Sequence, residues 1–367
     1  MHTPSLSEHE SFMRACFLLA LKGYNQVKSN PLVGCIITVE GKIIASGYHQ
    51  KYGQAHAEVN AIEQVKDLEI LKQATLYVNL EPCTHYGKTP PCTDLIIRHC
   101  IPRVVIANVD PYEKVAGKGM EALRKAGIEV HQGILSQIGN YVNRAFFTYI
   151  EQKRPYVILK WAESADGYIT AQYPKKVPIS SAETYMHTQK LRAYADAILI
   201  GKNTLWNDNP KLTVRSIPQA KNPIRIVVSR NVHIPSAAFL WNGEAPTWYL
   251  YPKAHGNFYP FSQTFEYVPL PDTQPNTVLQ FLYQKGIKSL LIEGGSNILE
   301  QYLSAHLYDE VWIYKSKNLY LKSGIKAPTF SQPLNLFEEK IENYIYYYSR
   351  VGMWKDFWKE QENEKFA

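Results

Sequence analysis

A histidine, a glutamate and two cysteines stand at spacings that suit a metal site. His56 and Glu58 lie in the stretch "AHAEVNAIEQV", and Cys83 and Cys92 lie in "LEPCTHYGKTPPCTD". One imidazole and two thiolates suit Zn²⁺, and three protein ligands leave a fourth position for water, as in catalytic zinc sites. Zinc lowers the pKa of a bound water to about 7, which supplies hydroxide at neutral pH. Glu58 is near the start of a predicted helix, where it can move the proton of that water without binding the metal.

The other cysteines, Cys16, Cys35 and Cys100, have no such neighbours, and we expect them to be small buried hydrophobic residues. Five cysteines in 367 residues are sparse and odd in number, which argues against a disulfide scaffold and predicts a cytoplasmic protein. The N-terminus has no basic segment followed by an apolar one, so no secretory signal is expected. The apolar run "ACFLLAL" is far shorter than the roughly 20 residues that span a membrane.

Length and composition predict a globular protein of two domains. A chain of 367 residues exceeds the usual size of one domain, and its content of 45% hydrophobic and 20% charged residues is ordinary. The formal net charge of +7 is a modest surplus. This charge suits an anionic small substrate as well as a nucleic acid, so it does not choose between them.

Hydrophobic periodicity predicts an α/β layered domain over residues 1–150. We expect helices over 8–23, 55–68, 92–100 and 119–128, a hairpin of two strands over 32–49, and strands over 74–80 and 103–110. A second α/β domain is predicted over residues 151–367. Its strands are expected over 156–164, 195–204, 223–230, 288–296 and 309–316, and its helices over 181–195 and 296–306. Residues 231–285 suggest no site.

The metal-site pattern resembles the signature of zinc nucleobase deaminases, His-x-Glu followed by Pro-Cys-x-x-Cys, in which the glutamate is the general acid and base. Here eight residues separate Cys83 from Cys92, and this longer loop resembles the deaminase domain of the bifunctional deaminase–reductases of the riboflavin pathway. The motifs "NPLVGC", "GYHQKYG", "HAEVNA" and "VDPYEKVAGKG" are also similar to that family. The resemblance implies a cytidine-deaminase-like three-layer α/β/α fold. It further implies that the deaminase substrate is contacted by Asn30, His49, His85, Lys88 and Asp110.

Three segments of the second half resemble the reductase domain of the same family: "LKWAESADGYIT", "LRAYADAILIGKNTLWNDNPKLTVR" and "LIEGGSNIL". The resemblance implies an α/β domain like dihydrofolate reductase that uses NADPH. It implies substrate contacts from Arg192, Leu212, Arg215 and Glu293. It also implies cofactor contacts from Lys160, Ser164, Thr204, Asp208, Arg230, Gly294, Gly295 and Ser296.

The residue types in these segments are compatible with that chemistry. Gly294 and Gly295 stand between a predicted strand and a predicted helix, where the backbone can approach a phosphate at the helix N-terminus. Arg192 and Arg215 could form an anion clamp for a substrate phosphate. The candidates for a polar role in hydride transfer are Lys160, Asp208 and Glu293.

Two positions in the second half depart from the family. Ser229 stands where the family usually has an aspartate after a strand, and Pro178 stands where many members have a tryptophan. Both positions bear on cofactor or substrate contacts. Arg230, which follows Ser229, is our candidate contact for the 2′-phosphate of NADPH.

The leading hypothesis is a two-step enzyme of riboflavin synthesis, which deaminates a phosphorylated pyrimidine and then reduces its ribosyl group. The resemblance also implies a homo-oligomer, either a dimer or a tetramer. The alternative is a nucleic-acid base deaminase with a basic binding domain. Against this alternative stand the long cysteine spacing, the modest charge and the absence of Lys and Arg runs, so we expect neither a nucleic acid nor a membrane as partner. A binding module without activity is disfavoured, because the ligand set and Glu58 are complete.

Overall fold

The fold is described from a computed structural model, which covers residues 4–24, 26–27, 30–84, 90–112, 115–172, 177–218, 220–231, 238–256, 258, 264–329, 337–340 and 343–349. The chain forms two compact units, and among the described residues the first ends at Gln152 and the second begins at Lys153. A search of the described helices finds none with the length and apolar character needed to cross a bilayer.

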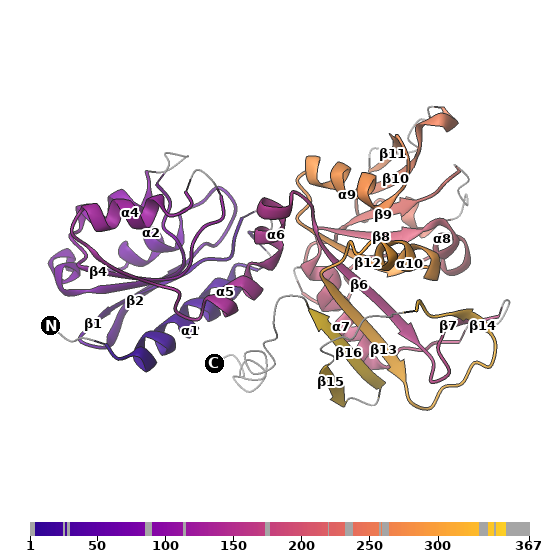
Figure 1. The fold of residues 1–367 in the computed structure, drawn as a ribbon, viewed down its shortest axis with the longest axis horizontal. Helices are drawn as coiled ribbons and strands as arrows, with labels where there is room; N and C mark the ends of the chain where they lie inside the picture. The colour runs from indigo at the N-terminus through magenta and orange to yellow at the C-terminus, as the bar shows by residue number, and fades with distance from the viewer. Residues whose placement is uncertain are drawn as a thin grey trace. The chain divides into compact units, whose positions relative to one another are not determined.

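The first unit is built on a five-stranded sheet with the order β2-β1-β3-β4-β5. Figure 1 labels β1, β2 and β4 of this sheet and the helices α1, α2 and α4. Strand β1 runs antiparallel to β2 and to β3, while β3, β4 and β5 are parallel. Its elements in chain order are α1 (Leu6–Lys22), β1 (Gly34–Val39), β2 (Lys42–Tyr48), α2 (Ala57–Ile62), the 3₁₀ helix η1 (Leu68–Gln73), β3 (Thr75–Leu80), α3 (Cys92–Arg98), β4 (Arg103–Asn108), α4 (Lys118–Lys125), β5 (Glu129–Gln132), α5 (Ser136–Val142) and α6 (Arg144–Gln152).

Helices cover both faces of this sheet because its central strands are apolar on both sides. Leu76 and Val78 of β3 belong to the core beneath α2, α3 and α4, whereas Tyr77 packs with α1 and α5. Side chains alternate between the two faces of a strand, so a strand that is buried throughout requires a helical layer on each side. This is the predicted three-layer α/β/α arrangement.

Some local predictions in the first unit were wrong. The helix predicted over 55–68 ends at Ile62, because Asp67 begins a separate 3₁₀ turn by accepting a hydrogen bond from the backbone N–H of Glu69. Strand β5 and helices α5 and α6 were not predicted. Cys16 and Cys35 are buried as expected, but Cys100 is exposed, in a left-handed turn after α3.

The second unit contains a nine-stranded sheet with the order β11-β10-β9-β8-β12-β6-β13-β16-β15. The strands from β11 to β13 are parallel, and β16 and β15 extend the sheet in antiparallel fashion. Its elements are β6 (Tyr156–Glu163), β7 (Tyr168–Ala171), α7 (Ala182–Tyr194), β8 (Ala197–Gly201), α8 (Lys202–Asp208), β9 (Ile224–Val228), the 3₁₀ helix η2 (Phe239–Trp241), β10 (Thr247–Pro252), the 3₁₀ helix η3 (Lys253–His255), β11 (Phe265–Leu270), α9 (Pro275–Gln284), β12 (Ser289–Gly294), α10 (Ser296–Ser304), β13 (Glu310–Ser316), β14 (Gly324–Lys326), β15 (Phe337–Lys340) and β16 (Asn343–Ser349).

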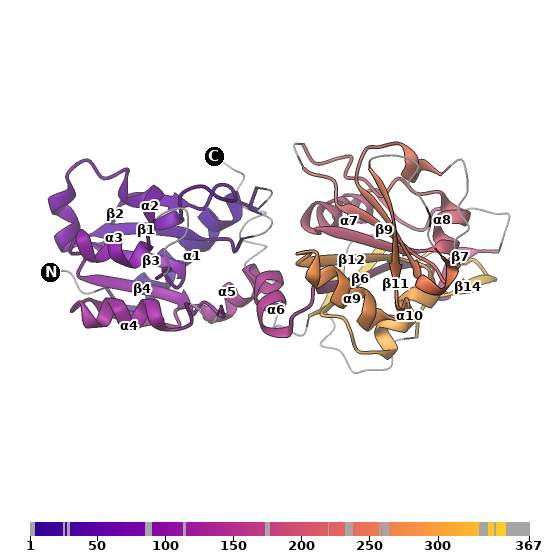
Figure 2. The ribbon, with the colours of Figure 1, turned by 90° about the horizontal axis from the view of Figure 1, so that it is seen from above.

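Helices also lie on both faces of the second sheet. Leu279 of α9 and Leu299 of α10 share a core with Leu159 of β6 and Leu199 of β8. Figure 2 shows α7 on the opposite side of this sheet from α9 and α10. The segment from 231 to 285 contributes β10, β11 and α9 to the sheet and its cover, which gives it a packing role. The strand predicted over 195–204 ends at Gly201, where α8 begins.

Candidate active sites

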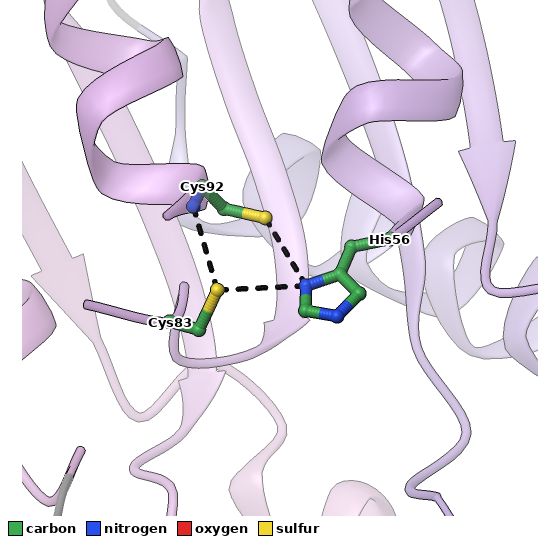
Figure 3. A group of neighbouring side chains, drawn as sticks. All are labelled: His56, Cys83 and Cys92. Carbon is green, nitrogen blue, oxygen red and sulfur yellow. Dashed lines mark hydrogen bonds between the residues drawn. The ribbon is translucent and has the colours of Figure 1, made fainter. Parts of the chain in front are cut away.

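The three predicted metal ligands lie together in the first unit (Figure 3). His56 is the N-cap residue of α2, Cys83 follows β3, and Cys92 is the first residue of α3. The Nδ1 atom of His56 is 3.5 Å from Sγ of Cys83 and 3.3 Å from Sγ of Cys92. All three ligand atoms lie within 4.8 Å of one another.

This geometry fits a tetrahedral zinc ion. Zn–S bonds of about 2.3 Å and Zn–N bonds of about 2.0–2.1 Å place N and S donors ~3.5 Å apart at the tetrahedral angle. The observed separations between His56 and the two cysteines agree with that spacing. A set of one nitrogen and two sulfur donors also matches the preference of zinc for such ligands.

One of the two cysteines, Cys83, is held in surroundings that favour its thiolate. The thiol of Cys92 donates a hydrogen bond to the sulfur of Cys83, which lowers the pKa of Cys83 and raises that of Cys92. The backbone N–H of Cys92 also donates to Sγ of Cys83 at 3.4 Å. Because the thiolate is the form that binds a metal, these donors favour the metal-binding state of Cys83, whereas Cys92 has to give up its proton when a metal binds.

Glu58 lies beside the cluster on the first turn of α2 and is only 3% exposed. Burial raises the pKa of its carboxyl group, and its side chain is hydrogen-bonded to Cys92. The predicted proton carrier is therefore buried next to the three ligand residues, of which His56 and Cys83 are partly exposed.

His49 and Asn30 form a second polar pair at this site. Nδ1 of His49 faces the carbonyl oxygen of Ala55 at 3.0 Å, so it carries the proton and donates. Nε2 of His49 therefore accepts from Nδ2 of Asn30 at 2.9 Å. The rings of His49 and His56 meet edge to face with centroids 5.7 Å apart, which places the pair beside the metal ligands.

Two buried asparagines that the sequence reading missed hold the segment after Asn30. Oδ1 of Asn143 accepts from the backbone N–H of Leu32 at 2.7 Å, and Nδ2 of Asn143 donates to its carbonyl oxygen at 3.0 Å. Nδ2 of Asn79 donates to the same carbonyl at 2.9 Å. Asn79 lies on β3 and Asn143 follows α5, and both are buried. A polar residue at these positions indicates a structural role only when the places of β3 and α5 in the fold are known.

Of the other predicted deaminase residues, Asp110 lies in the described part of the chain. The backbone N–H of Asp110 donates to Oε2 of Glu81, and Oδ1 of Asp110 accepts from the backbone N–H of Tyr112. This carboxylate is thereby fixed at the end of β4. His85 and Lys88 lie outside the described residues.

In the second unit, Arg192 and Glu293 form a bidentate ion pair. Nε and Nη2 of Arg192 each donate to one carboxylate oxygen of Glu293 at 2.7 Å, and Nη1 donates to the carbonyl oxygen of Thr213 at 3.2 Å. Both side chains are about one-tenth exposed or less. Burial lowers the pKa of Lys160, although the Glu293 carboxylate opposes this shift, so the three charges influence one another.

The segment after α8 lies against this ion pair. Leu212 is buried and has a φ of 53°, an uncommon conformation for a leucine. The backbone N–H of Arg215 donates to Oε1 of Gln189 at 2.8 Å, and its exposed guanidinium lies 5.8 Å from the ring centroid of Tyr185. Gln189 was not predicted; it precedes Arg192 by one helical turn, and that position on α7 is the only sequence signal for it.

The predicted cofactor residues follow the carboxyl ends of neighbouring parallel strands, where open α/β sheets bind ligands. Strands β9, β8, β12 and β6 are adjacent and parallel. They are followed respectively by Arg230, by Thr204 and Asp208 on α8, by Gly295 and Ser296, and by Ser164. The structure therefore brings these residues, with Gly294 at the end of β12, to one edge of the sheet.

Several of these side chains already have partners within the chain. The hydroxyl of Ser164 donates to Asp166 at 2.6 Å and accepts from the backbone N–H of Tyr168. The hydroxyl of Ser296 donates to the carbonyl oxygen of Lys326 at 2.9 Å. A Cβ at Gly295 would lie 3.1 Å from Oγ1 of Thr204, and the φ of Gly295 is 76°, so glycine is required there.

Ser229 stands where the family usually has an aspartate, so this position after β9 carries no negative charge. The hydroxyl of Ser229 donates to the carbonyl oxygen of Asn231 and closes a turn. Arg230 beside it is exposed. Pro178 lies before α7 with no regular secondary structure, and no contact in the described residues gives it a role.

His187 gives the second unit a specific pH dependence. Its Nδ1 lies 2.6 Å from the hydroxyl oxygen of Tyr314, and its ring packs 4.3 Å from the centroid of Trp312. Burial, with smaller contributions from Lys190 and Lys160, lowers the pKa of His187 to about 4. The unfolded chain takes up this proton below its ordinary pKa of 6.5, before the folded chain does.

We therefore expect the free energy of unfolding of this unit to fall as the pH is lowered from 6.5 towards 4. For this one group the slope is at most about 1.4 kcal/mol per pH unit, which gives a loss of about 1 kcal/mol between pH 7.5 and 5.5. Urea unfolding at both pH values would measure the loss in the wild type and in His187→Gln. Equal losses in the two proteins would contradict the prediction.

Comparison with known proteins assigns the two sites to one family of proteins. Residues 6–108 match the family "Cytidine and deoxycytidylate deaminase zinc-binding region", and residues 155–316 match "RibD C-terminal domain". The riboflavin biosynthesis protein RibD of Aquifex aeolicus is 38% identical over 342 residues, which cover 91% of this chain and 95% of that protein. The chain belongs to the RibD family.

Two solved structures are similar to this chain over 94% of its length. The deaminase–reductase of Thermotoga maritima has a TM-score of 0.85 and 32% identity, and covers 94% of this chain and 99% of its own. RibD of Acinetobacter baumannii has a TM-score of 0.81 and 30% identity, with the same two coverages. The predicted family and fold class are confirmed: a cytidine-deaminase-like first domain precedes a RibD reductase domain. The chain is thus a bifunctional deaminase–reductase of riboflavin biosynthesis.

Proposed function

We propose that this chain catalyses two successive reactions on one phosphorylated pyrimidine. Residues 1–150 would hydrolyse the 2-amino group of 2,5-diamino-6-ribosylamino-4(3H)-pyrimidinone 5′-phosphate. Residues 151–367 would reduce the ribosyl group with NADPH to give 5-amino-6-(5-phosphoribitylamino)uracil. The observation that carries the proposal is the cluster of His56, Cys83 and Cys92 with Glu58 beside it, in a chain that matches RibD proteins along nine-tenths of its length.

In the deaminase domain, His56, Cys83 and Cys92 would hold zinc, which supplies an activated water at neutral pH. Glu58 would take one proton from the attacking water and deliver it to the ring nitrogen, and would then pass the second proton of that water to the amino group, which departs as ammonia. Its burial suits this work, because a carboxyl group whose pKa is raised by burial accepts and returns a proton more readily near neutral pH. Water and the aminopyrimidine are consumed, and the pyrimidinone and ammonia are released.

Asn30 and His49 would orient the pyrimidine. Because Nδ2 of Asn30 donates to Nε2 of His49, the carboxamide presents Oδ1 as an acceptor for an amino or ring N–H group of the substrate. His49 is held neutral, since burial lowers its pKa and Ala55 fixes its tautomer. Asp110 would accept from another ring donor, and we propose His85 and Lys88 as contacts for the phosphate and the ring edge.

In the reductase domain, the proposed NADPH site is the edge of the sheet that carries Gly294, Gly295 and Ser296. The N-terminus of α10 begins there and offers backbone N–H donors to a phosphate, with Lys160, Ser164, Thr204 and Asp208 on or after the neighbouring strands. Arg230 is proposed for the 2′-phosphate. NADPH would supply hydride to C1 of the ring-opened ribosylamine.

The substrate of the reductase would meet Leu212, Arg215 and the Arg192–Glu293 pair. The nitrogens of Arg192 donate to Glu293 and Thr213, so Arg192 holds the carboxylate in place, and we assign the substrate phosphate to the exposed Arg215. Glu293 and Lys160 then present an acceptor and a donor to the polar ribose chain. We further propose, from family membership, a cytoplasmic homo-oligomer, either a dimer or a tetramer.

The test is a two-product assay of the purified chain. Given zinc, NADPH and the diaminopyrimidine ribosylamine phosphate, the protein should release ammonia and oxidise NADPH. After removal of zinc with a chelator we expect ammonia release to stop, while NADPH oxidation continues when the deaminated pyrimidine is supplied directly. No NADPH oxidation with either pyrimidine would refute the reductase half, and ammonia release that is unaffected by zinc removal would refute the deaminase half.

A further inference from the structure

Glu81 is a buried carboxylate that accepts hydrogen bonds from four backbone N–H groups of one distant segment. The residue follows β3 and is 4% exposed. Its Oε2 accepts from Asp110 at 3.2 Å and from Gly117 at 2.9 Å. Its Oε1 accepts from Gly119 at 2.8 Å and from Met120 at 3.2 Å. Hydrogen bonds to an ionised acceptor are roughly twice as strong as neutral ones, so this carboxylate holds both ends of the segment firmly.

The carboxylate replaces a cap that the segment itself lacks. Helix α4 begins after Gly117, which has no side chain to satisfy the first N–H groups of the helix. Glu81 accepts from two of these groups and places a negative charge at the positive end of the helix dipole. The start of α4 is therefore determined by a residue 36 positions before its N-cap.

The contact between Glu81 and α4 leaves no space for a side chain at Gly119. A Cβ at Gly119 would overlap the carbonyl oxygen of Pro82 and would lie 2.9 Å from Oε1 of Glu81. The backbone N–H of Glu81 also donates to the carbonyl oxygen of Asn108 at 2.9 Å, which ties the ends of β3 and β4 together. Two residues beyond Glu81 the same strand end reaches Cys83 of the metal cluster.

We propose that Glu81 is a positioning residue of the deaminase, which fixes Asp110 relative to the metal ligands. It has no role in the chemistry at the reacting carbon; it sets the distance between the part of the site that holds zinc and the part that binds the pyrimidine. The inference rests on the proposed function, because that proposal assigns Asp110 to the substrate.

The first test is Glu81→Gln, which keeps the size of the side chain but turns an NH₂ group towards two backbone N–H donors. We expect KM for the diaminopyrimidine to rise at least about tenfold, because Asp110 loses the charged acceptor that fixes its backbone. The kcat for ammonia release, the zinc content and NADPH oxidation with the deaminated pyrimidine should change little. An unchanged KM would overturn the proposal, and so would a loss of zinc with KM unaltered, which would show that Glu81 supports Cys83 instead.

Two further proteins sharpen the result. Gly119→Ala disturbs the same contact from the opposite side and should raise KM in the same way. Glu121→Gln removes an exposed carboxylate from the same helix, where it pairs only with Lys125 among the contacts of the described residues, and should leave KM unchanged. A rise in KM with Glu121→Gln as large as with Glu81→Gln would contradict a specific role for Glu81.

Hydrogen exchange separates this inference from the proposed function, because it needs no substrate. The amides of Asp110, Gly117, Gly119 and Met120 should be protected in the wild type and should exchange faster in Glu81→Gln. If the wild type lacked deaminase activity but showed this difference, the proposed function would fail while the structural basis of the inference stood. Equal exchange in both proteins would overturn the inference itself.

Discussion

Glu58→Gln is expected to slow ammonia release by about 10³-fold, within the 10²–10⁴ range of general acid–base catalysis. The wild-type carboxylate is buried at the first turn of α2 and is hydrogen-bonded to Cys92 beside the metal ligands. Glutamine has the same size but cannot take or return a proton. Zinc content, measured by metal analysis, should stay at the wild-type value, because Glu58 is not one of the three clustered ligands.

The second domain of the same chain provides the control for this variant. NADPH oxidation should be lost with the diaminopyrimidine and restored when the deaminated pyrimidine is supplied. Glu63→Gln removes an exposed carboxylate at the other end of α2 and should retain full deaminase activity. Deamination at the wild-type rate in Glu58→Gln would exclude Glu58 as the proton carrier, and a parallel loss of zinc would show that it supports the metal instead.

The metal centre could be predicted because its residues are local to the ends of regular elements. His56 and Glu58 stand two residues apart at the start of a helix, and Cys92 opens another helix after an apolar strand. A helix start fixes the directions of its first side chains, so sequence spacing carries over into geometry. The alternation of helical and strand segments likewise predicted a layered α/β domain, and β3 is buried between helices on both of its faces.

The residues that hold the segments of the sites in place could not be predicted in the same way. Asn143 holds Leu32 across 111 residues, and Glu81 holds Gly119 across 38. Nothing in the local sequence of a buried asparagine or glutamate names its partner, because the partner is brought near only by the order of strands in the sheet. The same limit applies to Arg192, for which we predicted a phosphate clamp with Arg215 and did not foresee the ion pair with Glu293.

Arg192→Met is expected to lower the free energy of unfolding of the second domain by about 3–5 kcal/mol and to abolish NADPH oxidation. Removing one member of a buried ion pair leaves the other charge without compensation, which is the reason for so large a loss. In the wild type, burial alone would raise the pKa of Glu293, but the charges of Arg192 and Lys160 outweigh it and lower the pKa. Glu293 therefore stabilises the fold above its ordinary pKa of 4.5, and that contribution is lost as the pH falls through the lower folded value.

A double-mutant cycle distinguishes the ion pair from two independent contributions. Glu293→Leu should be about as destabilising as Arg192→Met, whereas the double variant should be less destabilising than the sum of the two, because no unpaired charge remains between them. Five of the seven tryptophans lie in the described part of the second domain and none lies in residues 1–152, so urea unfolding followed by tryptophan fluorescence reports chiefly on the second domain. The matched control is Lys315→Met, which removes a cation from a more exposed pair with Glu163 and should lower the free energy of unfolding by no more than about 1 kcal/mol.

Additive effects of Arg192→Met and Glu293→Leu would mean that their contact contributes nothing specific. A double variant that regains stability but not NADPH oxidation would instead assign the pair to the substrate site as well as to the fold.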